Sequence, residues 1–215
     1  MMRRRPLGNL EEMRTLLALR LVATAIAAAG ASAEAHPHLR FSFRIAPLLE
    51  ETRLTGLQVQ WELDPIASML VRRGADVNGN GELDADELDA FARGNHSLLA
   101  PRGYLLQIMR EGDPQPFAVS RALKARLQDG RVALDFEVRL QSPVEPHSLS
   151  VSFFDSTWYV ALNAAEPVLA GDTPCHALPR LAQWTTVGWG EQPVSVVDLA
   201  CAPHGPVRPA AIATH

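Results

Sequence analysis

Strict alternation of apolar and polar residues is the feature that most constrains the fold of this chain. In "RVALDFEVRL", residues 131–140, every second residue is apolar, from Val132 to Leu140. Successive side chains of a β-strand point to opposite faces, so this spacing predicts a strand with one buried and one polar face. The pattern recurs in "LRFSFRI" (39–45), "LQVQWEL" (57–63) and "SLSVSF" (148–153).

Further strand candidates, less regular in pattern, are "YLLQIM" (104–109), "TWYVAL" (157–162) and "PVSVVDLA" (193–200). Turn-forming residues such as Asp129-Gly130 separate the candidates. Many short strands with such separators are typical of an antiparallel β-sandwich or barrel. We therefore expect a mainly β (α+β) fold, with one inserted helical unit.

The helical unit is predicted at about residues 65–97. In "LDPIASMLVRRGA" (63–75), Asp64 can cap a helix and Pro65 can occupy its first turn. A second helical stretch runs from about Asp86 to His96. Between the two helices lies the most specific motif in the chain, "DVNGNGELDADE".

This segment, Asp76 to Glu87, matches the twelve-residue EF-hand calcium loop. Gly81 stands at position six, where the chain turns sharply, and Leu83 at position eight is expected to pack inward. Calcium is a hard cation that takes six to eight oxygen ligands. The expected ligands are the side chains of Asp76, Asn78 and Asn80, the carbonyl of Glu82, Asp84 through water, and both carboxylate oxygens of Glu87. The alternative is an acidic turn that joins two helices.

The first 35 residues are typical of a signal peptide that is removed. A charged start and an apolar middle lead to Ala33-Glu34-Ala35, the small-residue form that signal peptidase cleaves. The apolar run is shorter than the roughly 20 residues of a membrane span. We expect a periplasmic domain at 36–201, a disordered tail rich in Pro and Ala at 202–215, and no membrane span after cleavage.

The amino-acid composition limits the classes of partner that this chain is expected to bind. Of 20 Lys+Arg and 24 Asp+Glu, five basic and three acidic residues lie in the first 35, which gives residues 36–215 a net charge of about −6. With no basic patch, nucleic acid is not an expected partner. Behind a secretion signal, Cys175 and Cys201 are expected to form one disulfide, with two free thiols as the alternative.

The order of motifs resembles a bacterial periplasmic family of unknown function labelled "ABC-type uncharacterized transport system, periplasmic component". The segments that carry the resemblance are "HPHLRF", "WELDPIAS", "DVNGNGELDADE" and "FFDSTWYVAL", within residues 36–201. This chain departs from the family directly after His-Pro-His, where it has Leu39, Arg40 and Phe41. The resemblance implies a role in handling nickel, cobalt or zinc, in support of a membrane metal transporter.

His36 and His38 form a second candidate metal site. Residues two apart on a strand share a face, so both imidazoles could reach one ion, and cleavage after Ala35 would add the amine of His36. Nitrogen ligands favour Zn²⁺, Cu²⁺, Ni²⁺ or Co²⁺ over calcium. Asp155, Asp64 and His147 are candidate further ligands, of which Asp155 is preferred. The alternative is a polar strand end in solvent.

Three functions are compatible with these observations. The first is a periplasmic metal-binding accessory protein for a transporter, with calcium in the EF-hand loop and a transition metal at His-Pro-His. The second is a copper-dependent redox enzyme or copper carrier that uses an N-terminal histidine chelate. The third is a calcium-stabilised interaction domain. We find no nucleophile motif, phosphate loop or HExxH motif in the sequence, so an enzyme is not the expected function.

Overall fold

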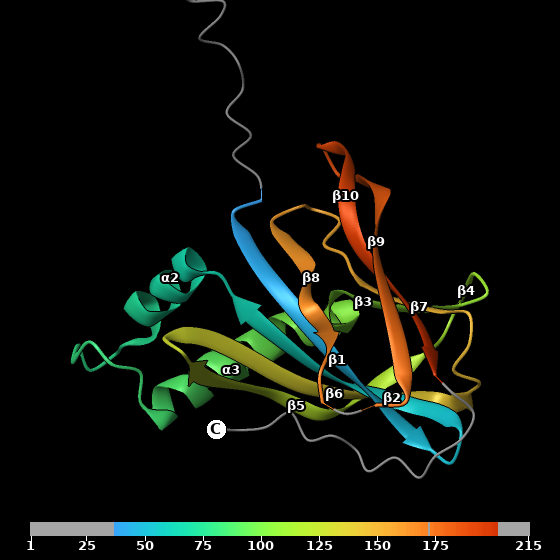
Figure 1. Ribbon diagram of the computed structural model, residues 1–215. Coiled ribbons are helices and arrows are strands. Elements are labelled where there is room, and N and C mark those ends of the chain that lie inside the picture. The colour runs from blue at the N-terminus through green and yellow to red at the C-terminus, as the bar shows by residue number, and fades with distance from the viewer. Residues whose placement is uncertain (1–36, 172, 202–215) are drawn as a thin grey trace, which may run out of the picture. The chain divides into compact units, whose positions relative to one another are not determined.

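The computed structural model describes residues 37–171 and 173–201, which contain two five-stranded β-sheets and two α-helices (Figure 1). The elements in chain order are β1 (Leu39–Glu50), β2 (Arg53–Leu63), α2 (Pro65–Ala75), α3 (Ala85–Leu99), the 3-10 segment η1 (Ala100–Leu105), β3 (Leu106–Arg110), β4 (Asp113–Pro114), β5 (Phe117–Gln128), β6 (Arg131–Val144), β7 (Leu149–Phe153), β8 (Val160–Leu169), β9 (Cys175–Thr186) and β10 (Gly190–Cys201). The predicted signal peptide, the predicted C-terminal tail and His36 lie outside the described residues.

The first sheet has the strand order β5-β6-β2-β1-β8, and the second has the order β4-β3-β7-β10-β9. Neighbouring strands are antiparallel except β1 and β8, which run parallel with Leu39 opposite Val160. The parallel pair departs from the antiparallel prediction because the chain leaves β7 in the second sheet and crosses to the edge of the first. The mainly β sandwich is otherwise confirmed.

The core lies between the inner faces of the two sheets. Phe153 of the second sheet contacts Phe43 and Trp61 of the first, with ring centroids 4.7 and 5.5 Å apart. All the inward residues predicted for residues 57–63 and 131–140 are buried. Alternation therefore identified the inner face of the first sheet correctly. The pattern is informative because a register shift of one residue would turn the apolar side chains of a strand to the opposite face.

Glu137 lies on the polar face of β6, yet it is not exposed to solvent. Its side chain is buried at 7% exposure beneath Ser120, Arg121 and Arg139. Desolvation acts to raise the pKa of Glu137, but hydrogen bonds from Ser120 and Arg139 and the charges of Arg139 and Arg121 outweigh it. The pKa of Glu137 therefore lies below its ordinary value.

Two long strands, β5 and β9, were not predicted, and both lie at sheet edges. Edge strands bury little apolar surface, so their sequences need no strict alternation; β9 is exposed at most positions. The strands predicted at residues 104–109 and 157–162 begin later, at Leu106 and Val160. Tyr104 and Trp158 have positive φ, which belongs to a turn rather than a strand.

The helical unit forms as predicted, with α3 somewhat longer. Asp64 caps α2 by accepting a hydrogen bond from the N–H of Ala67 at 2.7 Å, and Pro65 is its first residue. α2 packs on β6, β1 and β2, and α3 packs on β5 (Figure 1). Ala67 and Leu83 join the core of the sandwich. The helices therefore cover part of the inner face of the first sheet.

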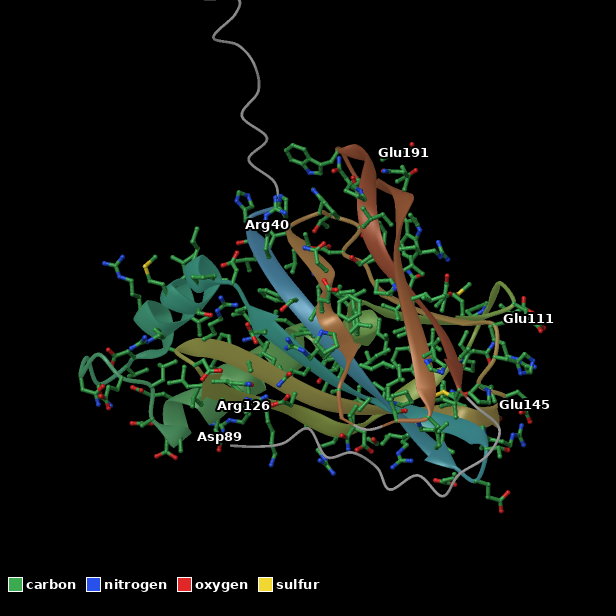
Figure 2. All side chains as sticks on the ribbon, viewed as in Figure 1. Arg40, Asp89, Glu111, Arg126, Glu145 and Glu191 are labelled. Carbon is green, nitrogen blue, oxygen red and sulfur yellow. A yellow bond between two sulfur atoms is a disulfide. The ribbon has the colours of Figure 1, made fainter. Side chains whose placement is uncertain are left out.

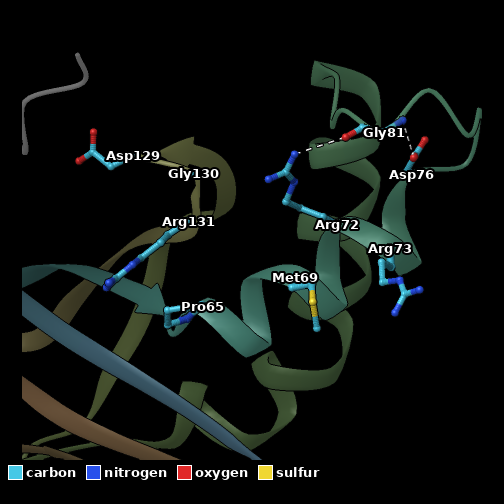
Figure 3. A pocket seen from close by; sticks show the side chains of 9 residues that line it. All are labelled: Pro65, Met69, Arg72, Arg73, Asp76, Gly81, Asp129, Gly130 and Arg131. Carbon is cyan, nitrogen blue, oxygen red and sulfur yellow. Dashed lines mark hydrogen bonds between the residues drawn. The ribbon is translucent and has the colours of Figure 1, made fainter.

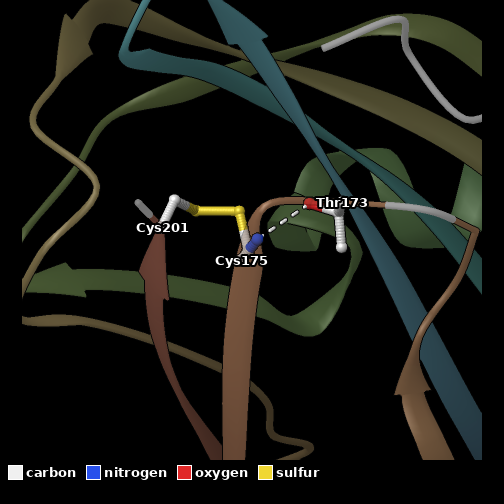
Figure 4. Close-up of a disulfide and its surroundings, with 3 residues drawn as sticks. All are labelled: Thr173, Cys175 and Cys201. Carbon is white, nitrogen blue, oxygen red and sulfur yellow. Dashed lines mark hydrogen bonds between the residues drawn. A yellow bond between two sulfur atoms is a disulfide. The ribbon is translucent and has the colours of Figure 1, made fainter. Parts of the chain in front are cut away.

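The predicted disulfide is confirmed. It joins Cys175, the first residue of β9, to Cys201, the last residue of β10, across the paired ends of the hairpin (Figure 4). Such a bond is compatible with a protein outside the cytoplasm. Charged side chains such as Glu111, Glu145 and Glu191 are exposed (Figure 2). Within the described ranges, no helix has the length and apolar character needed to cross a membrane.

Candidate functional site

The loop from Asp76 to Glu87 is fixed at both ends by the helices it joins. Asp76 is the C-cap of α2, and its backbone N–H donates to the carbonyl of Arg72. Asp84 is the N-cap of α3 and forms a capping box with Glu87. Each of these acidic residues is therefore held at a helix end, where orphan backbone groups are satisfied.

Asp76 organises the first half of the loop. Its Oδ1 accepts hydrogen bonds from the N–H groups of Gly79 and Asn80, at 2.7 and 3.1 Å. Its Oδ2 accepts from the N–H of Gly81 at 2.8 Å. Gly81 has a φ of +85°, a conformation that residues with a Cβ rarely adopt. The sequence prediction of a sharp turn at Gly81 is consistent with this backbone.

Glu87 connects the end of the loop to its beginning. Its Oε1 accepts from the backbone N–H groups of Val77 at 2.7 Å and Asn78 at 3.2 Å. Its Oε2 accepts from the N–H of Asp84 at 3.1 Å. The side chain is buried at 7% exposure, which is unusual for glutamate unless its oxygens are paired. The carboxylate thus faces the interior of the loop.

The remaining predicted ligands are exposed and bonded to one another within the same loop. Asn78 donates from its side-chain amide to Asp84 Oδ2 at 3.2 Å. Asn80 accepts from the N–H of Glu82 through its Oδ1 at 2.8 Å. The structure therefore brings all six predicted calcium ligands into one hydrogen-bonded segment that contains carboxylate, amide and carbonyl oxygens.

The loop is not a preassembled cluster of carboxylates. Among residues 37–171 and 173–201, no three His, Cys, Asp or Glu side chains are grouped closely enough to hold a metal ion. The carboxylate oxygens of Asp76 and Glu87 accept backbone N–H groups instead. Its donor set fits calcium, a cation that also accepts neutral amide and carbonyl oxygens, but ligation requires the side chains to converge further.

Arg72 contacts the loop and was not identified from the sequence. Its Nη2 donates to the carbonyl of Gly81 at 3.3 Å. Arg72 also lines a cavity of about 500 Å³, together with Arg73 and Arg131 (Figure 3). The available signal was its place in the last turn of α2, next to a loop that curls back. Arg72 thus contacts the turn at Gly81, position six of the loop, from outside the loop.

At the second candidate site, the structure describes His38 but not His36. The N–H of His38 donates to the carbonyl of Tyr159 at 3.0 Å, and the two rings lie 4.9 Å apart between centroids. The strand begins only at Leu39, so the expected extension of its register to His38 is not observed. His38 is exposed at the corner where β1 meets β8.

Asp155, the preferred further ligand, lies in the turn that leads to Tyr159. Its Oδ1 accepts from the N–H and hydroxyl of Thr157, at 3.0 and 2.7 Å, and its Oδ2 accepts from the N–H of Val160 at 3.1 Å. These bonds are those of a buried turn residue. The turn places Asp155 and His38 at the same corner of the sandwich.

The two other candidates differ in position. Asp64 lies near this corner, because its N–H donates to the carbonyl of Arg40 at 3.1 Å, but its carboxylate caps α2. His147 precedes β7, whereas Asp155 follows the other end of that strand, so the length of β7 separates them. The transition-metal site stays a prediction.

Comparison with known proteins identifies the family of this chain. Residues 21–178 match the model of a family described as "Protein of unknown function (DUF1007)". The match covers both helices and the loop between them, and it ends within β9, before Cys201. No curated protein matches the chain. The expected resemblance to a family of unknown function is confirmed at that level.

Proposed function

We propose that this chain, which belongs to the DUF1007 family of proteins of unknown function, is a calcium-binding β-sandwich domain outside the cytoplasm. The observation that carries the proposal is the position of Glu87. Its buried carboxylate lies against the N–H groups of Val77 and Asn78 at the start of the loop. Glu87, at position twelve of the loop, is thus close to Val77 and Asn78 at positions two and three, as a calcium loop requires.

The ion would be held by oxygens alone. Asp76, Asn78 and Asn80 supply side-chain oxygens, Glu82 supplies its carbonyl, and Asp84 acts through water. Glu87 supplies both carboxylate oxygens after exchanging its N–H partners for the ion. This set matches calcium, which accepts irregular geometry, better than magnesium, which demands a near-ideal octahedron.

The role of calcium is structural in this proposal. The loop connects two helices that cover part of the inner face of the first sheet, and Leu83 within the loop joins the core. An ion that binds only the folded loop stabilises the fold by RT ln(1 + [L]/Kd), about 1.4 kcal/mol when calcium is tenfold above Kd. Modules of this kind outside cells bind calcium at about 10⁻⁴–10⁻³ M.

A second function is transition-metal binding at His36 and His38 in support of metal transport in the periplasm. The supporting observation is that His38 contacts Tyr159, and the turn before Tyr159 contains Asp155. An imidazole and a carboxylate from distant parts of the sequence thus share one corner. A copper-dependent redox enzyme would use the same histidines and would additionally turn over peroxide or a reductant, whereas a copper carrier would use them only to bind the ion. A calcium-stabilised interaction domain would bind no transition metal.

Thermal unfolding in calcium and in EDTA tests the main proposal. Calcium is expected to raise the melting temperature of the native chain, and Asp76→Asn is expected to reduce that increase. Asp89→Asn removes the same charge from an exposed position of α3 outside the loop, and it is expected to behave like the native chain. An equal calcium response in both variants would exclude the loop as the site.

A further inference from the structure

An apolar cavity of about 580 Å³ lies between the helices and the first sheet. We call it the helix–sheet pocket. Phe41, Leu63 and Leu134 line it from the sheet, and Val71 and Phe91 line it from α2 and α3. The inner face of the first sheet thus forms one wall and the helical unit forms the other. Its volume falls within the range of about 300–1,000 Å³ that is typical of small-molecule sites.

The wall of this pocket carries little charge. Glu87 is the one charged residue among the described residues that line it. Its carboxylate already accepts hydrogen bonds from the N–H groups of Val77, Asn78 and Asp84. An anionic ligand would therefore lose its hydration without meeting an opposite charge, and a cationic ligand would find the carboxylate already engaged by these N–H groups, so both are costly to bind. An uncharged ligand carries no such penalty.

Two polar groups are available to orient a ligand in the helix–sheet pocket. Asn95 donates its side-chain N–H to the carbonyl of Phe91 at 2.9 Å, and its amide oxygen can accept a hydrogen bond. Tyr159, the residue before β8, also lines the pocket and is 49% exposed. A few polar groups within a mainly apolar wall are typical of a ligand site.

We propose that the helix–sheet pocket binds an uncharged, elongated apolar molecule, such as an acyl or alkyl chain that ends in a hydroxyl group. The apolar part would contact Phe41, Leu134 and Phe91. The hydroxyl would bond to Asn95 or Tyr159. Binding of this molecule is a function separate from calcium binding. The contacts proposed for it involve no metal ion.

Gly74 allows a test that leaves the fold intact. It lines the pocket from α2, and a Cβ built on it meets no atom within 4 Å. Leucine at this position therefore has room to extend into the cavity, and it also has a higher helix propensity than glycine. Gly94 is the matched control, because it is a glycine within α3 with equally open surroundings, and it does not line the pocket.

The experiment is a fluorescence titration of the native chain, Gly74→Leu and Gly94→Leu with N-phenyl-1-naphthylamine, an uncharged apolar probe, in calcium-containing buffer. The native chain and Gly94→Leu are expected to bind one probe per chain with equal affinity. Gly74→Leu is expected to bind at least about tenfold more weakly, as one leucine-sized apolar group occupies the site. Circular dichroism checks that both variants are folded.

A neutral long-chain alcohol is expected to displace the probe from the native chain. Absence of saturable probe binding to the native chain would overturn the proposal, as would equal affinities of the Gly74→Leu and Gly94→Leu variants. Displacement by an amphipathic peptide but not by the alcohol would also overturn it, because the occupant would then be a protein segment.

Discussion

Glu87 accepts a hydrogen bond of 2.7 Å from the backbone N–H of Val77, ten residues earlier in the chain. The bond joins the end of the loop between α2 and α3 to its beginning. Both residues also line the helix–sheet pocket. The candidate calcium loop and the candidate apolar site therefore share a wall, and the geometry of Glu87 affects both.

The capping role of Asp84 can be separated from its predicted role in calcium binding. Asp84 Oδ1 accepts from the N–H of Glu87 at 3.0 Å, a bond that needs no metal. Asp84→Ala is therefore expected to lose about 1 kcal/mol of unfolding free energy in EDTA, as measured by urea denaturation. Asp86→Ala, in the first turn of α3 but not at the cap, is expected to lose less. Equal losses would show that general charge at the helix start, not the cap, is responsible.

Much of the fold was predictable because the chain buries one face of each inner strand. Alternation identified the buried face of β6, and Asp64 with Pro65 identified the start of α2. Strand pairings between segments distant in sequence were not predictable. The parallel pairing of β1 with β8 depends on a crossing between sheets, and the edge strands β5 and β9 bury too little to show a pattern.

The candidate sites likewise divide into features that were predictable from the sequence and features that were not. The calcium loop was visible because its predicted ligands lie within twelve consecutive residues. The contact of Arg72 with Gly81 and the ring contact of His38 with Tyr159 depend on how the chain folds back. The helix–sheet pocket combines residues from five separate segments, and no local motif identifies such a combination.

Glu137 is expected to make stability depend on pH. Its folded pKa is lowered from 4.5, so its ionised form stabilises the fold above that pH and this contribution is lost as the pH falls through the folded pKa. Native chain and Glu137→Gln are compared by urea unfolding from pH 7 to below pH 4.5. The native chain is expected to be more stable at pH 7, and the difference is expected to shrink with acid. Glu191→Gln, at an exposed position of β10, serves as the control. A difference that stays constant with pH would contradict the account.

The histidine site depends on where the signal peptide is cut. A chain that begins at His36 has an α-amine with a pKa of about 8, which can join its own imidazole on a metal ion. One extra residue before His36 keeps both imidazoles and moves the amine away. This extension is expected to weaken binding of Cu²⁺ or Ni²⁺ in competitive titrations, and His36→Ala and His38→Ala are expected to weaken it further. Equal binding by all four chains would leave the histidines as a polar strand end.

Calorimetric titration of calcium into the native chain, Glu87→Gln and Glu82→Gln tests the central claim most directly. Both substitutions remove one negative charge from the same loop, but Glu82 is expected to bind calcium only through its backbone carbonyl, which the substitution keeps. The native chain and Glu82→Gln are expected to bind one calcium ion each, and Glu87→Gln is expected to lose most of its affinity. No calcium binding by the native chain, or equal affinity in the two variants, would contradict the account.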